Sequence, residues 1–314
     1  MAEVLRVGSR ASRLALVQTE WVVARLREAW PDLAVRVEAI RTAGDASRAT
    51  PLAAGGLGVG VFVKELEAAL LAGRIDLAVH SMKDVPTRAP EGLEVEASVP
   101  RRADPRDCLV TPAGHALEDL PRGAKVGSSS PRRRAMLLAA RADLRFTDLR
   151  GNVETRLAKL AAGRCDATVL ARAGLERLGM LDGRAWTVPV SVALPAAGQG
   201  ALGLEFRAGD ERVRGLVGAV DDAASRWAVA AERALVRRLG AGCRTPLGVL
   251  GRVDATGRLA LEAYLVSADG RASLRERAEG SAADAPAIGV RLAETLLSAG
   301  AARWIERGNA AADA

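Results

Sequence analysis

The chain has 314 residues, 49% of them apolar and 26% charged, which is typical of a globular protein of two or three domains. No run of about 18 apolar residues occurs and the first residues lack a secretory-signal pattern, so we expect a cytoplasmic protein without a membrane span. The net charge is +7, and the three cysteines, Cys108, Cys165 and Cys243, lie far apart. With only two histidines, this spacing favours neither a disulfide framework nor a metal site.

The first 200 residues repeat a short β-rich run, a Gly/Ser turn and an amphipathic helix. Strands are predicted at 4–7, 34–41, 75–80, 125–127, 145–149 and 167–170. Helices are predicted at 14–30, 62–72, 153–162 and 173–178, and another begins at Pro131. Alternation at this spacing predicts an α/β fold with open, mostly parallel sheets and helices on both faces.

The pattern changes after residues 195–200. A long helix is predicted at 222–239, ended by Gly240, and a final helix at 286–299. Between them, three strands are predicted at 246–253, 258–266 and 272–279. We therefore expect a small α+β domain that begins near residue 221.

Arginines gather where three of the predicted helices begin. Arg10 precedes the first helix, Arg132 and Arg133 open a second, and Arg150 and Arg156 flank the start of a third. Helix N-termini already carry partial positive charge, so added arginines fit best if an anion binds there. The alternative is that each arginine pairs with a surface carboxylate. The chain has no GxxxxGK[ST] loop, which argues against an ordinary nucleotide phosphate site.

Asp84 and Cys243 are the two further candidates. Asp84 follows a predicted strand and precedes Val85-Pro86, where the proline favours an extended residue before it. It is either a turn aspartate or, among arginines, a carboxylate that stabilises cations and moves protons. Cys243 lies in a glycine-rich loop after a helix C-terminus, which disfavours a thiolate nucleophile. It is either a small buried hydrophobe or the carrier of a covalent group.

The motifs as a set resemble those of porphobilinogen deaminases, in family order and across nearly the whole chain. They are GSRASRLAL (8–16), FVKELE (62–67), VHSMKDVP (79–86), DPRD (104–107), GSSSPRR (127–133), LRGNVETRL (149–157), AGLERLG (173–179), PAAGQGALGLE (195–205) and GAGCRTPLG (240–248). The resemblance implies two domains similar to type-II periplasmic binding proteins, plus a third domain with the cofactor cysteine. The implied boundaries are 1–98 plus about 199–220, then 99–198, then 221–314.

The resemblance also implies the chemistry and the cofactor. A dipyrromethane would be joined by a thioether to Cys243, and four porphobilinogen molecules would be added stepwise. Each would lose ammonia to give an electrophilic azafulvene that the terminal pyrrole attacks, and water would finally release hydroxymethylbilane. Every pyrrole ring carries two carboxylates, so the resemblance implies that the arginine clusters bind the carboxylates of the growing chain. The implied protein is a cytoplasmic transferase of tetrapyrrole (porphyrin and heme) biosynthesis, which we expect to be a monomer.

The resemblance assigns a role to each candidate residue. The catalytic residues would be Asp84, Arg10, Arg150 and Arg156. Cofactor contacts would come from Cys243, Ser81, Lys83, Asp84, Arg102, Ser128, Ser129, Arg132, Arg133 and Arg150. Substrate contacts would come from Arg10, Ser12, Arg150, Arg156, Arg177 and Gln199. No metal is expected.

The glycine-rich loop departs from the family pattern. Many members carry lysines there, whereas residues 53–61 read AAGGLGVGV, so a lid at this position would close without its own positive charge. The main rival function is a non-enzymatic anion- or solute-binding protein on the same scaffold. A nucleic-acid binder is a third possibility, but separate arginine turns and only nine aromatic residues argue against it.

Overall fold

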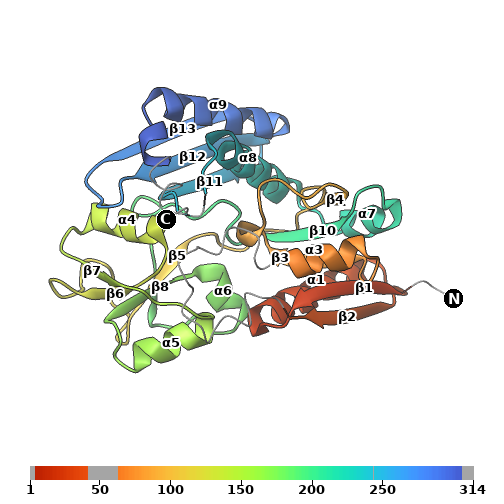
Figure 1. The fold of residues 1–314 in the computed structure, drawn as a ribbon, viewed down its shortest axis with the longest axis horizontal. Coiled ribbons are helices and arrows are strands. Elements are labelled where there is room, and N and C mark those ends of the chain that lie inside the picture. The colour runs from red at the N-terminus through yellow and green to blue at the C-terminus, as the bar shows by residue number, and fades with distance from the viewer. Residues whose placement is uncertain (1–3, 42–62, 243, 306–314) are drawn as a thin grey trace.

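The computed structural model describes residues 4–41, 63–242 and 244–305. Within them the strands form two five-stranded mixed sheets and one three-stranded antiparallel sheet, each with its own helices (Figure 1). The predicted α/β class, with mostly parallel sheets and a small α+β C-terminal part, is confirmed. No helix among these residues is both long and apolar enough to cross a membrane. The glycine-rich segment 53–61 and Cys243 lie outside the described residues.

The first sheet has the order β2-β1-β3-β10-β4, and β10 is its one antiparallel strand. Its strands are β1 (Leu5–Arg10), β2 (Val35–Ile40), β3 (Leu77–Ser81), β4 (Leu93–Glu94) and β10 (Leu202–Arg207). The helices that belong to it are α1 (Arg13–Ala29), α3 (Lys64–Leu71) and α7 (Glu211–Gly218). Leu5, Leu77 and Phe206 are fully buried in this sheet, which shows that β10 is part of its core.

The second sheet repeats this arrangement with the order β7-β6-β8-β5-β9, β5 being antiparallel to its neighbours. Its strands are β5 (Asp107–Val110), β6 (Lys125–Gly127), β7 (Arg145–Thr147), β8 (Ala167–Ala171) and β9 (Ala185–Thr187). Its helices are α4 (Pro131–Ala140), α5 (Val153–Ala161) and α6 (Arg172–Arg177). As predicted, Pro131 occupies the first turn of α4, and Ser130 caps that helix through the Arg133 amide.

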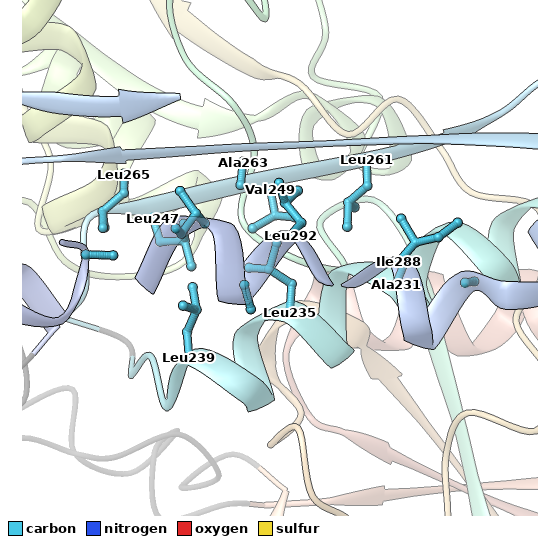
Figure 2. Packing of buried hydrophobic residues seen from close by; sticks show 14 of the residues in the cluster. Ala231, Leu235, Leu239, Leu247, Val249, Leu261, Ala263, Leu265, Ile288 and Leu292 are labelled. Atoms are coloured by element: carbon cyan, nitrogen blue, oxygen red, sulfur yellow. The ribbon is translucent and has the colours of Figure 1, made fainter. Parts of the chain in front are cut away.

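The C-terminal part packs two helices on an antiparallel sheet. The helices are α8 (Ala223–Leu239) and α9 (Ala285–Ser298), the latter preceded by the short helix η3 (Ala282–Asp284). The strands are β11 (Leu247–Val253), β12 (Arg258–Val266) and β13 (Ser273–Ser281). Figure 2 shows Leu235 and Leu292 beneath Val249 and Ala263, and all four are fully buried or nearly so. Gly240 ends α8 in the left-handed conformation, as its place in the sequence predicts.

The chain connects the two five-stranded sheets twice. It leaves the first sheet after β4 to enter the second at β5, and it returns to the first at β10. At the return, the Ala103 amide donates to the Gly200 carbonyl, so the two crossing segments lie side by side. The exact domain boundaries expected from the resemblance remain a prediction.

Candidate active site

A small pocket of about 70 Å³ lies at the carboxyl ends of β1 and β3, where ligands commonly bind in open α/β sheets. It brings together four residues that the sequence singled out from two separate segments: Arg10, Ser12, Ser81 and Asp84. Its remaining lining is Leu14, Ala15, Gln18, Val63, Val79 and His80. A cation, hydroxyls and a carboxylate therefore face one space, as the hypothesis of a carboxylate-bearing substrate requires.

Two serines form the polar edges of this pocket. Ser12 is the N-cap of α1, and its hydroxyl accepts from the Ala15 amide at 3.4 Å. Ser81 ends β3, and its hydroxyl lies 3.0 Å from the amide nitrogen and 3.1 Å from the amide oxygen of Gln18. Gln18 is 97% buried in α1, so this contact fixes the end of β3 against the helix.

Asp84 is carried by the short 3₁₀ helix η2 (Met82–Asp84), which follows β3 directly. The Met82 amide donates to the Ala201 carbonyl at 3.0 Å, and the Val85 amide donates to the Met82 carbonyl at 3.1 Å. Val85 is extended, as expected of the residue before Pro86. The Asp84 side chain is half-buried in the pocket wall, and its backbone is held at both ends of the turn.

A second polar group lies between the sheets, centred on Asp107 of β5. The carboxylate is 99% buried, accepts from Arg133 at 2.8 Å and from the Gln199 amide at 2.9 Å, and forms an ion pair with Arg132 at 2.8 Å. Burial acts to raise the pKa of Asp107, but Arg132 and then Arg133 outweigh burial and hold this pKa well below its ordinary value. Asp107 is therefore ionised and fixes both guanidinium groups at the start of α4.

Lys83 links the two groups. Its ammonium donates to the Gln199 amide oxygen at 3.4 Å, and Asp84, Arg133, Asp107 and Arg132 all lie near enough to act on its charge. Burial is the largest cause that lowers the pKa of Lys83 to about 8. Its charge therefore depends on pH near neutrality, which the sequence alone does not indicate.

The remaining predicted arginines differ in their surroundings. Arg156 is half-buried near Arg133 and Asp84, and burial lowers its pKa to about 10. Arg177 donates to the Gly200 carbonyl at 2.8 Å, and burial likewise lowers its pKa to about 10. Arg150 is exposed beside the N-terminus of α5, which the Asn152 side chain caps. The structure thus brings Arg156 to the Asp84 group and leaves Arg150 at the surface.

Three of the predicted cofactor contacts have other hydrogen-bond partners. Arg102 forms a bidentate ion pair with Glu232 of α8 at 2.6 and 3.1 Å, and it donates to the Gln199 carbonyl. The Ser128 hydroxyl accepts from the Ser130 amide at 3.2 Å, and the Ser129 hydroxyl accepts from the Leu149 amide at 3.1 Å. Both serine hydroxyls thus act as acceptors, whereas the Arg102 guanidinium joins the C-terminal part to the crossing segments.

Sequence reasoning missed four residues that shape the site: Gln18, His80, Asp107 and Glu232. Asp107 could have been identified from the sequence, because it ends the DPRD motif at 104–107. The others carry no local signal, since their partners are distant in sequence. Among the described residues, no group of three or more His, Cys, Asp or Glu side chains is placed to hold a metal ion.

The donor set suits a ligand with several carboxylates. The Asp84 pocket and the Asp107 group together offer Arg10, Arg156, Lys83 and two helix N-termini capped by Ser12 and Ser130. Asp84 is the carboxylate that lines the pocket itself. The residues present therefore fit a ligand with several carboxylates better than a cationic or apolar ligand.

Comparisons with known proteins cover nearly the whole chain. Residues 5–215 match the family model "Porphobilinogen deaminase, dipyromethane cofactor binding domain", and residues 227–298 match "Porphobilinogen deaminase, C-terminal domain". The porphobilinogen deaminase of Pelotomaculum thermopropionicum is 49% identical over 98% of this chain and 97% of its own length. That of Thermus thermophilus is 47% identical over 95% of this chain and 96% of its own.

Remote likenesses occur among solved structures. The periplasmic VFT2 domain of Bordetella pertussis BvgS is 14% identical with a TM-score of 0.41, over 69% of this chain and 86% of that chain. The BenM effector binding domain with benzoate is 17% identical with a TM-score of 0.40, over 68% and 87%. Neither likeness bears on what this chain binds.

Proposed function

Because the chain belongs to the porphobilinogen deaminase family, we propose that its own Asp84 pocket performs the chemistry of that family. The enzyme is a transferase that condenses four porphobilinogen molecules with loss of ammonia and releases hydroxymethylbilane. Its cofactor is dipyrromethane. One observation supports the site assignment most: the fold brings Arg10, Ser12, Ser81 and Asp84 into one pocket from two segments about 70 residues apart.

Asp84 is the proton carrier in this proposal. Its carboxylate is the one that lines the pocket, and its backbone is fixed by the η2 turn. When the C–N bond of the aminomethyl group breaks, Asp84 delivers a proton to the departing ammonia. Once the new C–C bond has formed, Asp84 would take up the α-proton that the nucleophilic pyrrole carbon must lose to become aromatic again. One carboxylate thereby ends each addition in the state in which it began.

The cations bind carboxylates and keep them oriented. Arg10 and Ser12 bind the acetate or propionate of the incoming porphobilinogen, and Arg156 stabilises negative charge next to Asp84. Arg177, at the crossing segments, and Arg150, at the exposed end of α5, bind further carboxylates as the product grows. Gln199 contributes to substrate binding through its neighbours, because its amide donates to Pro105 and Asp107 and accepts from Lys83. Charge-assisted contacts of this kind are each worth about 1.5–3 kcal/mol.

The cofactor side of the site comes mainly from the second sheet, with Ser81, Lys83 and Asp84 added from the end of β3 and from η2. When bound, the dipyrromethane supplies the nucleophilic pyrrole carbon to which new rings are joined. In this proposal Cys243 holds it through a thioether, and Lys83, Ser81, Asp84, Ser128, Ser129, Arg132, Arg133 and Arg150 hold its carboxylates and pyrrole nitrogens. Arg102 acts through its ion pair with Glu232, which fixes the segment carrying Gln199.

Substitution of Asp84 by Asn tests this assignment. Removal of a positioned acid–base group lowers turnover by about 100- to 10,000-fold. The covalent mass increment of the cofactor should persist, because the scaffold and Cys243 are unchanged. Asp148→Asn is the matched control, since Asp148 lies in the arginine-rich half with a side chain that is 69% exposed. Turnover of Asp84→Asn within threefold of the parent protein would refute the proposed role.

The proposal includes a cytoplasmic, monomeric enzyme whose ligands are porphobilinogen and the growing polypyrrole, with neither nucleic acid nor a membrane as a partner. Sedimentation equilibrium at micromolar concentration should give the mass of one chain. A mass of two chains would contradict the proposal that the enzyme is a monomer. Retention on DNA that persists at 0.5 M salt would contradict the absence of a nucleic-acid partner.

A further inference from the structure

His80 and Glu205 form a buried polar pair in the first sheet, directly behind the Asp84 pocket. The His80 Nε2 atom lies 2.9 Å from Glu205 Oε2, and the two side chains are 2% and 0% exposed. The other carboxylate oxygen, Glu205 Oε1, has no hydrogen-bond partner among the described residues. Burying a carboxylate with one oxygen unsatisfied destabilises the fold, so packing alone does not explain why this pair stands in the core.

One further acidic side chain, Glu67 of α3, lies near the pair. The charges of both Glu205 and His80 act on the Glu67 carboxyl group. Burial, and then the charge of Glu205, raise the pKa of Glu67.

The position of the pair connects the two chain segments that build the site. His80 lines the pocket and immediately precedes Ser81 and η2, the turn that carries Asp84. Glu205 lies in β10, six residues after Gln199, which accepts from Lys83. In the antiparallel register His80 pairs with Gly203, so the His80–Glu205 contact runs diagonally and locks β3 against β10.

We propose that the His80–Glu205 pair is a positioning device for Asp84: it fixes the end of β3 relative to β10, and so the carboxylate relative to the cations opposite it. The proposal rests on the catalytic role assigned to Asp84 above. His80 donates from Nε2 to Glu205 and acts through the backbone of Ser81 and η2. A shift of the reacting geometry by about 1 Å costs up to roughly 100-fold in rate, so loss of the device lowers kcat.

The same three strands provide a matched control at their other end. Asp76, before β3, pairs with Arg6 of β1 at 2.6 Å and with Arg207 of β10 at 3.0 Å, and its side chain is 6% exposed. Asp76→Asn therefore removes a buried charge from the same sheet without touching the pocket. A general loss of sheet stability affects Asp76→Asn and Glu205→Gln alike, whereas a positioning role affects only the latter.

The experiment measures kcat, KM, thermal midpoint and intact mass for Glu205→Gln, His80→Gln, His80→Phe and Asp76→Asn. We expect kcat to fall roughly 10- to 100-fold in Glu205→Gln and His80→Phe, with KM within about twofold, because the carboxylate-binding arginines are untouched. His80→Gln retains an amide that donates to Glu205, so it should recover most of the lost kcat. Asp76→Asn should lower the thermal midpoint and leave kcat near that of the parent protein.

Two outcomes overturn the inference. One is a normal kcat in both Glu205→Gln and His80→Phe. The other is a kcat loss in His80→Gln as large as that in His80→Phe, which would show that the hydrogen bond to Glu205 is irrelevant. If Glu205→Gln does not fold, the two His80 variants decide between these results. The Asp84→Asn variant separates the two possible failures. If the Asp84 assignment is wrong, Asp84→Asn stays active. If only the positioning role is wrong, Asp84→Asn loses turnover while the His80 variants keep it.

Discussion

Replacing Asp107 by Asn should be among the most damaging isosteric changes in the second sheet. Asp107 is 99% buried, and its carboxylate is the counterion of two guanidinium groups, Arg132 and Arg133, which are themselves buried. The amide of Asn keeps the shape and loses the charge. Both arginines would then remain buried at the start of α4 without the carboxylate that balances them.

The expected magnitude follows from this geometry. Removing one partner of a buried ion pair costs about 3–5 kcal/mol, because the remaining charge is left uncompensated. At roughly 1.5–2 °C per kcal/mol for a chain of 314 residues, the thermal midpoint should fall by about 5–10 °C. Because the folded pKa of Asp107 is held below its ordinary value, this stability is fully present above about pH 4 and is lost as pH falls through the folded pKa.

Calorimetry or circular dichroism at pH 7.5 measures the effect. Asp104→Asn is the matched control, because Asp104 lies three residues away and also pairs with two arginines, Arg106 and Arg172. Its side chain is 22% exposed, so water can replace the lost contacts and the cost should be about 1 kcal/mol. A midpoint for Asp107→Asn within about 3 °C of the Asp104→Asn value would refute the argument that burial makes this carboxylate essential.

Two further predictions concern the site and the crossing segments. Because the pKa of Lys83 is lowered to about 8 and Lys83 holds cofactor carboxylates in this account, kcat should fall as pH increases from 7 to 9, and Lys83→Arg should abolish that fall; equal profiles would contradict it. Gly200 has φ +86°, and a Cβ there would lie 2.5 Å from the Ala103 carbonyl oxygen, whereas one at Gly163 (φ +69°) would meet nothing within 4 Å. Gly200→Ala should therefore destabilise the protein by at least about 1–3 kcal/mol more than Gly163→Ala in urea titrations, and equal losses would contradict the clash.

Local signals predicted much of the fold. Ser130-Pro131 places an N-cap and a proline at the start of α4, and Asn152 caps α5, both within one residue of expectation. Strand β12 has the predicted bounds, Arg258–Val266. These elements carry their own start and stop signals, so no distant contact is needed to define them.

Elements that depend on distant partners were missed. β5 (Asp107–Val110) and β10 (Leu202–Arg207) are the antiparallel strands of their sheets, and each pairs with strands far away in sequence. Both are buried on two faces, so they lack the alternation that marks a half-exposed strand. Their pairing partners, and not their composition alone, make them strands.

The sequence predicted most residues of the site but not the contacts between their side chains. Arginines at helix N-termini led to the expectation of an anion, and the structure adds an internal one, the Asp107 carboxylate, for Arg132 and Arg133. Asp107 lies 25 residues from Arg132, a separation at which sequence gives no sign of contact. The same applies to the pairing of His80 with Glu205, which are 125 residues apart.

The most direct test of the account is the intact mass of freshly purified protein, alone and after addition of porphobilinogen, for the parent chain and Cys243→Ser. The account predicts that the parent chain exceeds its sequence mass by one dipyrromethane and gains further steps of one pyrrole unit, and that Cys243→Ser lacks the increment. A parent chain that stays at its sequence mass, before and after porphobilinogen, would contradict the covalent cofactor and the stepwise condensation together.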